Sequence, residues 1–233
     1  MRALLLPLVF VLALAYPLAG QEAAPAAAAA TTLWPLERVD QIGEHAATVL
    51  GEPRAIDTAI GKAIEFDGQD DGIFLEVNPL QGLKQFTVEV IFRPAADGPK
   101  EQRFVHFQEN GTENRFLFEI RVTSGNRWFL DTFIKSGAGN YTQLAEKFPH
   151  PIGPWQHAAA VMDGRMMRHY VNGVEEMSTP VTYAAQGPGR TSLGVRINRV
   201  SWYRGAIRQI RVTPAVLTPD NFLKLQFSDT QVK

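Results

Sequence analysis

The segment from residue 155 to residue 174 reads WQHAAAVMDGRMMRHYVNGV, and it decides the fold class. Two strand-like runs, Gln156–Met162 and Met166–Val171, flank a loop that contains Asp163-Gly164. Asp-Gly between two such runs predicts a tight hairpin, because both residues tolerate positive φ. Asn172-Gly173 predicts a second turn where the second run ends. The segment therefore predicts consecutive antiparallel strands.

The same pattern continues on both sides of this segment. Short runs of alternating apolar and polar residues are separated by clusters of Gly, Pro, Asn and Asp, which is typical of an all-β sandwich. We therefore predict two packed antiparallel sheets and one short C-terminal helix, which begins at Thr218-Pro219-Asp220 and has an apolar face of Phe222, Leu223 and Leu225. The ten predicted strands span residues 63–66, 72–77, 86–93, 103–108, 116–123, 128–135, 156–162, 166–171, 191–195 and 207–212.

Several motifs follow one another in a fixed order along the chain. They are GKAIEFDG at 61–68, FTVEVIFRP at 86–94, WQHAAAVMDG at 155–164 with HYVNGV at 169–174, SLG at 192–194 and YRGAIRQIRV at 203–212. In this order and spacing they resemble the laminin-G-like (LamG) jelly rolls of the concanavalin A-like lectin/glucanase superfamily. The resemblance implies two packed antiparallel sheets, one of them bowed, with loops gathered at the rim. Members bind sugars, proteins or calcium, and catalytic relatives cleave polysaccharides, so the fold alone does not give the function.

The N-terminal 20 residues have the composition of a signal peptide. Arg2 precedes a short apolar run, which is followed by a proline and small residues up to Gly20. The alternative is a membrane anchor, but a span needs about 20 apolar residues and this run is shorter. Gln21 stands where a lipoprotein would carry its lipid-bearing cysteine. We expect a secreted protein, periplasmic or extracellular, with no membrane span after cleavage.

The rest of the chain is expected to form one domain between two short flanking segments. Residues 21–32 are an Ala-rich flexible tether, residues 33–226 the laminin-G-like domain and residues 227–233 a tail. The 233-residue chain contains no cysteine, so its stability must come from burial and hydrogen bonding, and a cysteine-free exported chain fits a bacterial source. Its net charge of -1, without a basic cluster, excludes nucleic acid as the expected partner.

A polar strip is predicted on one face of two neighbouring strands. In residues 116–123 the even-numbered residues are apolar and should face the core, so Glu119 and Arg121 point together to the other face. Asp131 shares a face with Phe129 and Phe133 on the next strand. Carboxylate and guanidinium groups beside aromatic rings would suit a sugar. The alternative is a solvated sheet face that carries cross-strand ion pairs.

Further candidate residues lie in predicted loops. Tyr141 follows a glycine-rich stretch and is a candidate sugar platform, as are Trp202 and Tyr203, although the last two could instead plug one end of the sandwich. Asp67, Asp70 and Asp71 crowd a glycine-flanked loop, where hard oxygen ligands could hold calcium, the one candidate cofactor. The alternative is a plain acidic turn.

No catalytic constellation can be assembled from the sequence. Arg121 and Thr123 occupy the positions where laminarinase-like relatives need carboxylates, and the Tyr and His pair of alginate-lyase-like relatives is matched only by Tyr141 and His106. We therefore predict a secreted, non-catalytic module that binds a polysaccharide or other glycan. The alternatives are a protein-interaction or cell-envelope structural module with an envelope protein as partner, and a polysaccharide lyase that acts on uronate polymers.

Overall fold

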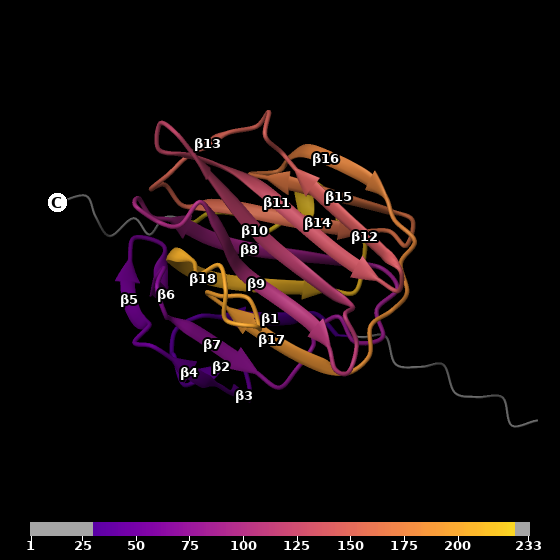
Figure 1. The fold of residues 1–233 in the computed structure, drawn as a ribbon, viewed down its shortest axis with the longest axis horizontal. Coiled ribbons are helices and arrows are strands. Elements are labelled where there is room, and N and C mark those ends of the chain that lie inside the picture. The colour runs from indigo at the N-terminus through magenta and orange to yellow at the C-terminus, as the bar shows by residue number, and fades with distance from the viewer. Residues whose placement is uncertain (1–29, 227–233) are drawn as a thin grey trace, which may run out of the picture.

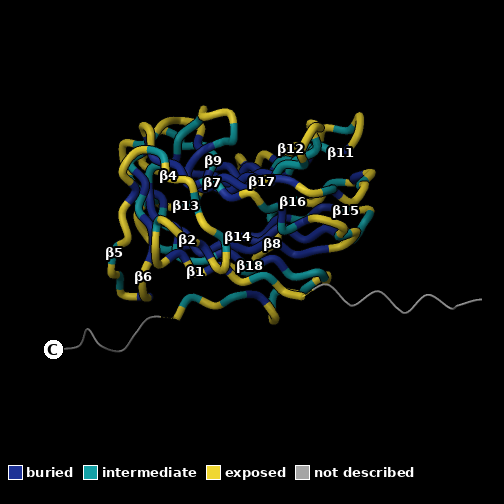
Figure 2. The backbone as a smooth tube through the Cα atoms, turned by 90° about the horizontal axis from the view of Figure 1, so that it is seen from below, coloured by how far each residue is buried: buried dark blue, intermediate teal, exposed yellow. Residues whose placement is uncertain are grey.

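The computed structural model describes residues 30–226, which form two stacked sheets (Figures 1 and 2). The predicted signal peptide, most of the predicted tether and the predicted tail lie outside the described residues. The buried residues lie mainly between the two layers, as Figure 2 shows. This is the predicted all-β sandwich, and all pairings between its named strands are antiparallel.

We name the two layers the back sheet and the front sheet. In spatial order the back sheet consists of β16 (Val174–Pro180), β15 (Met166–Val171), β14 (Gln156–Met162), β8 (Phe86–Pro94), β18 (Arg204–Thr213), β6 (Gly61–Asp67) and β5 (Arg54–Thr58), with β1 (Thr32–Pro35) also paired to β18. The front sheet consists of β12 (Gly139–Leu144), β11 (Arg127–Ser136), β10 (Arg115–Thr123), β9 (Glu101–Glu109), β17 (Gly189–Leu193), β7 (Gly72–Leu75) and β4 (Thr48–Leu50), with β13 (His150–Pro151) also paired to β11. A separate ribbon joins β2 (Gln41–Ile42) to β3 (His45–Ala46).

The core between the sheets is rich in aromatic side chains. Phe92 of β8 stacks on Phe104 of β9 with ring centroids 4.6 Å apart, and Phe104 in turn stacks on Phe118 of β10 at 5.9 Å. Each of these rings is fully buried. Offset aromatic pairs of this kind add to the free energy gained by burying apolar area, so they stabilise the packing of one sheet on the other without disulfides.

All ten predicted strands are present, and both predicted hairpin turns occur. In the first turn only Gly164 takes a positive φ, of 93°, whereas Asp163 accepts hydrogen bonds from the N–H groups of Arg165 and Met166. In the second turn both Asn172 and Gly173 have positive φ, at 50° and 83°. The first turn therefore needs glycine at one position, and its aspartate closes the loop by side-chain hydrogen bonds.

Eight strands within residues 30–226 were not predicted from the sequence, namely β1, β2, β3, β4, β5, β12, β13 and β16. Several of these are two to four residues long, and β16 is exposed at an edge, so the alternation of apolar residues is weak there. The predicted tether, residues 21–32, also extends too far, because Thr32 belongs to β1 and pairs with Val212 of β18.

The predicted C-terminal helix is reduced to a single 3₁₀ turn, η1 (Pro219–Asn221). Phe222 is extended, and the N–H of Leu223 donates to Oε1 of Glu89 at 2.6 Å instead of to a helical carbonyl. Phe222 then packs against Tyr170 and neighbouring residues on the outer face of the back sheet. Packing on the sheet therefore outweighs the local helix signal. Within residues 30–226 no helix has the length and apolar character needed to cross a bilayer.

Candidate functional site

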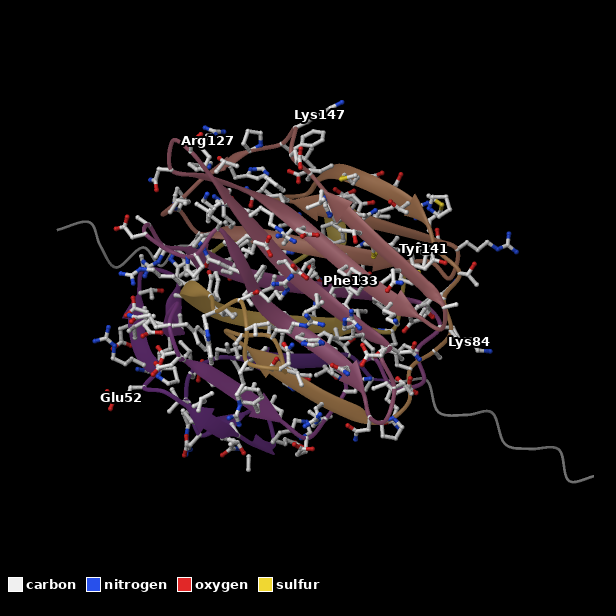
Figure 3. The ribbon with its side chains drawn as sticks, viewed as in Figure 1. Glu52, Lys84, Arg127, Phe133, Tyr141 and Lys147 are labelled. Carbon is white, nitrogen blue, oxygen red and sulfur yellow. The ribbon has the colours of Figure 1, made fainter. Side chains whose placement is uncertain are left out.

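The outer face of the front sheet gathers the polar strip that the sequence predicts. Glu119 on β10 and Asp131 on β11 are direct cross-strand partners, and Arg121 lies two residues farther along β10. Phe116, Phe118 and Ile120 face the core and are fully buried, so the predicted alternation is confirmed. Figure 3 looks onto this face and shows Phe133 over the same sheet.

Five charged side chains on this face form one ion-pair cluster. Asp131 Oδ2 accepts a hydrogen bond from Nε of Arg121 at 2.8 Å and forms an ion pair with its Nη2, also at 2.8 Å. Glu119 Oε2 lies 3.0 Å from Nε of Arg103 on β9 and 3.5 Å from Nη2 of Arg121. Glu101, also on β9, pairs with Arg121 and lies 3.8 Å from Arg103. The cluster thus ties together three neighbouring strands, β9, β10 and β11.

The ion-pair cluster holds three carboxyl groups and only two guanidinium groups. Burial raises the pKa of Glu119 to about 7, and the charge of Asp131 adds to the shift against the attraction of Arg103 and Arg121. Burial also raises the pKa of Asp131. Because five ionised groups would leave a net negative charge in a poorly hydrated place, Glu119 holds a proton up to neutral pH.

The ion-pair cluster is more buried than a ligand-contacting surface would be. The side chains of Glu119 and Asp131 are only 4% and 1% exposed, whereas Arg121 is 23% exposed. The structure thus contains cross-strand ion pairs, as the alternative of a solvated sheet face predicted, but the two carboxylates are buried and not solvated. Arg103 and Glu101 were not predicted as part of the site, because only strand pairing brings β9 beside β10.

Two further cross-strand rows continue the face beyond the ion-pair cluster. The first row runs through Phe133, Leu117, His106 and Ser192, and the second through Lys135, Arg115, Gln108 and Arg190. The Arg115 guanidinium lies over the Phe133 ring, 4.8 Å from its centroid, which is a cation–π contact. This face therefore combines an aromatic ring with donors on four adjacent strands. Sequence alternation already placed Phe133 on the face of Asp131.

Two of the three aromatic residues predicted as sugar platforms, Tyr141 and Tyr203, pack into the core and do not join this face. Tyr141 on β12 pairs with the core-facing Ile134, packs against the core and accepts a hydrogen bond from the N–H of Thr182 through its hydroxyl oxygen at 3.1 Å. Tyr203 is fully buried, with its ring 5.3 Å from Phe104, so it is a core residue. Trp202 is half-buried in the loop before β18. Tyr141 therefore does not share a surface with Glu119, Arg121 and Asp131.

The acidic loop between β6 and β7 forms a compact turn. Asp71 accepts the N–H of Glu52 at 2.7 Å and that of Asp67 at 2.9 Å, while Asp67 accepts the N–H of Gln69 at 2.8 Å. Burial raises the pKa of Asp71. Carboxylate oxygens of Asp67, Asp70 and Asp71 lie within 4.8 Å of one another, so the donor set fits a calcium ion as well as an acidic turn. Calcium binding stays a prediction.

A cavity of about 800 Å³ opens beside this loop, at the end of the sandwich where Glu52 is labelled in Figure 3. Its charged lining is mostly acidic, since it includes five carboxylates and two arginines. These residues are Glu52, Glu65, Asp67, Asp70, Asp71, Arg54 and Arg204. Arg204 Nη1 donates to the carbonyl of Asp67 at 3.1 Å, so one of the two cations is already engaged by the loop.

Comparison with known proteins supports the fold. A family model described as the concanavalin A-like lectin/glucanases superfamily matches residues 67–221. Domain 4 of AbnA, a GH43 extracellular arabinanase from Geobacillus stearothermophilus in complex with arabinotriose, is 24% identical with a TM-score of 0.54, covering 82% of this chain and 84% of that one. No curated protein sequence matches.

Two other solved structures share the fold at lower identity. A native heptameric SAP-like pentraxin from Limulus polyphemus is 17% identical with a TM-score of 0.54, covering 67% of this chain and 77% of that one. The binding domain of botulinum neurotoxin DC in complex with SialylT is 11% identical with a TM-score of 0.60, covering 82% of this chain and 49% of that one. At such identities the likeness shows the fold alone.

Proposed function

The chain belongs to the concanavalin A-like lectin/glucanases superfamily, and from this premise we propose that it is a secreted, non-catalytic module that binds glycans through the outer face of the front sheet. The observation that carries this proposal is the pair of cross-strand rows, which set the Phe133 ring beside charged and amide groups on the outer face of the front sheet. A sugar ring presents an apolar CH face and polar hydroxyl groups, and such a surface complements both.

The solved structures with this fold add support. Two of them are complexes, with arabinotriose in the arabinanase domain and with SialylT in the neurotoxin binding domain. Both chains are distant in sequence, so they support the class of ligand and leave its identity to experiment. Secretion rests on the signal-peptide composition of residues 1–20 alone.

Two features favour binding over catalysis. Tyr141 packs toward the core, while His106 lies in a row on the outer face, so the pair that a uronate lyase would need is split between two faces of the sheet. Glu119 and Asp131 are neighbouring carboxyl groups, but both are buried and engaged by arginines. A glycoside hydrolase needs its two carboxyl groups to flank an accessible bond, which these do not.

A glycan array with purified protein tests the proposal. We expect the wild type to bind one group of glycans and Phe133→Ala to lose most of that binding, because the half-buried Phe133 ring is the aromatic group of the two rows. Phe148→Ala is the matched control, since Phe148 is 41% exposed and lies outside the rows. Thermal unfolding of each variant verifies the fold.

Two results would overturn the proposal. If no glycan binds the wild type, with or without calcium, and envelope extract yields a protein partner, then the interaction-module alternative is correct. If incubation with uronate polymers raises the absorbance of unsaturated ends, the protein is a lyase.

A further inference from the structure

A group of cations lies at one end of the outer face, beyond the ion-pair cluster. Lys135, Arg115 and Arg190 come from β11, β10 and β17 and share one cross-strand row through Gln108 of β9. Arg196 reaches the same place from the loop after β17, where the N–H of Ile197 donates to Nδ1 of His106 at 3.0 Å. We call Lys135, Arg115, Arg190 and Arg196 the basic cluster.

The basic cluster differs from the neighbouring ion-pair cluster in its charge balance. Within residues 30–226, the side chains of Lys135, Arg190 and Arg196 have no hydrogen-bond or ion-pair partner. Arg115 pairs with Glu113 at 3.1 Å, but Glu113 is 70% exposed and therefore holds its partner loosely. The chain as a whole has a net charge of -1, so this concentration of unpaired positive charge is local.

A buried histidine lies beneath the basic cluster. His106 is 1% exposed, and its Nδ1 accepts the N–H of Ile197, so the proton of the neutral ring is on Nε2. Nε2 is buried and has no acceptor among residues 30–226. Burial lowers the pKa of His106 well below its ordinary value, and the charges of Arg196, Arg115, Arg103 and Arg190 lower it further. The ring is thus a neutral N–H donor surrounded by cations.

The basic cluster and the N–H of His106 together are suited to bind an anion. Guanidinium groups bind the oxygens of carboxylate and sulfate by paired, charge-assisted hydrogen bonds. Four cations from three strands and one loop can approach such a group from several sides, and the Phe133 ring under Arg115 provides an adjacent apolar surface. A neutral sugar would leave this positive charge uncompensated.

We propose that the basic cluster is a subsite for the acidic group of a glycan, either the carboxylate of a uronate unit or a sulfate ester. The proposal rests on the proposed function and adds to it a class of ligand and a place on the face. In this arrangement Arg190 and Arg196 bind the anionic oxygens, while the Phe133 end of the face takes the sugar ring. The bound glycan is therefore charged, and its affinity falls as salt rises.

The test measures the binding of three polysaccharides that differ in charge. These are polygalacturonate for the carboxylate, dextran sulfate for the sulfate and unmodified dextran for the neutral sugar, with polyaspartate as a polyanion without sugar. The variant Arg190→Gln/Arg196→Gln removes two unpartnered cations, and Lys135→Gln removes a third independently. Arg165→Gln is the matched control, because Arg165 is exposed in a turn of the back sheet and its side chain has no partner among the residues that the structure describes.

We expect the wild type to prefer one acidic polymer to dextran, and the double variant to lose about tenfold or more of that affinity. Lys135→Gln should show a smaller loss, and Arg165→Gln should bind as the wild type does. The inference is overturned if the double variant keeps its affinity, if dextran binds as well as the acidic polymers, or if polyaspartate competes equally. If the inference fails but Phe133→Ala still abolishes glycan binding, the proposed function stands. If no glycan binds the wild type, the proposed function itself is overturned.

Discussion

Replacing Glu119 with glutamine should stabilise the protein at alkaline pH and have much less effect in acid. Glu119 is buried, and its pKa of about 7 in the folded state compares with an ordinary value of 4.5. In the unfolded chain the carboxyl group ionises as the pH rises through 4.5, while the folded state holds the proton until about 7. The unfolded state therefore binds fewer protons in this window, and the free energy of unfolding falls as the pH rises.

The magnitude follows from the two pKa values. Their separation corresponds to about 3 kcal/mol once both states are ionised, of which about 2.5 kcal/mol accumulates between pH 5 and pH 8. Because glutamine does not ionise, the stability of Glu119→Gln relative to the wild type should rise by roughly that amount across this range.

Urea unfolding of wild type and Glu119→Gln at pH 5, 6, 7 and 8 measures this difference. Glu146→Gln is the control, since Glu146 is exposed and has no side-chain partner among the described residues, so its effect should be the same at every pH. The reasoning is refuted if the stability of Glu119→Gln relative to the wild type stays constant or falls as the pH rises. Glu119 would then be ionised in the folded state, and the excess of carboxyl over guanidinium groups would not control its protonation.

Four further predictions concern other parts of the sandwich. Gly194→Ala should cost about 2 kcal/mol or more in urea unfolding, because φ is 77° there and a Cβ would overlap the Phe66 ring. Burial lowers the pKa of His169 to about 4, so the protein should lose up to about 3 kcal/mol between pH 6.5 and pH 4 through this residue, a loss that His169→Gln removes in the same assay. Burial acts to raise the pKa of Glu89, but hydrogen bonds from His157, Arg211 and Leu223 leave it lowered. Glu89→Gln should therefore lower the free energy of unfolding by about 3 kcal/mol and speed amide exchange in residues 215–226. If the acidic loop holds calcium, added calcium should raise the melting temperature of the wild type and not that of Asp70→Asn; an equal response in both would refute the site.

Local signals predicted most of the fold. Alternation placed the inward and outward residues of β10 and β11 correctly, because the two-residue period of a strand is a property of neighbouring residues. The turns at Asp163-Gly164 and Asn172-Gly173 were predictable for the same reason. The same local signals wrongly predicted a C-terminal helix, because Phe222 and Leu223 are held by distant partners on β14, β15 and β8.

The candidate site was only partly predictable. Glu119, Arg121 and Asp131 were placed on one face by alternation, but their partners on β9 depend on register. The pairing of β9 with β10 shifts between Phe118 and Glu119, where Phe104 is an extra residue, and this bulge sets Arg103 opposite Glu119. A regular register would have moved every following side chain to the other face.

The sequence alone thus indicated ten of the strands, two hairpin turns and the inward or outward direction of side chains on β10 and β11, since each depends on residues a few positions apart. Only the tertiary structure decided which strands are neighbours. It turned Tyr141 toward the core, and it brought Arg190 and Arg196 beside Arg115, which lies more than seventy positions earlier in the chain. Strand order and register arise from burying two whole sheet faces against each other, a condition that no short segment contains.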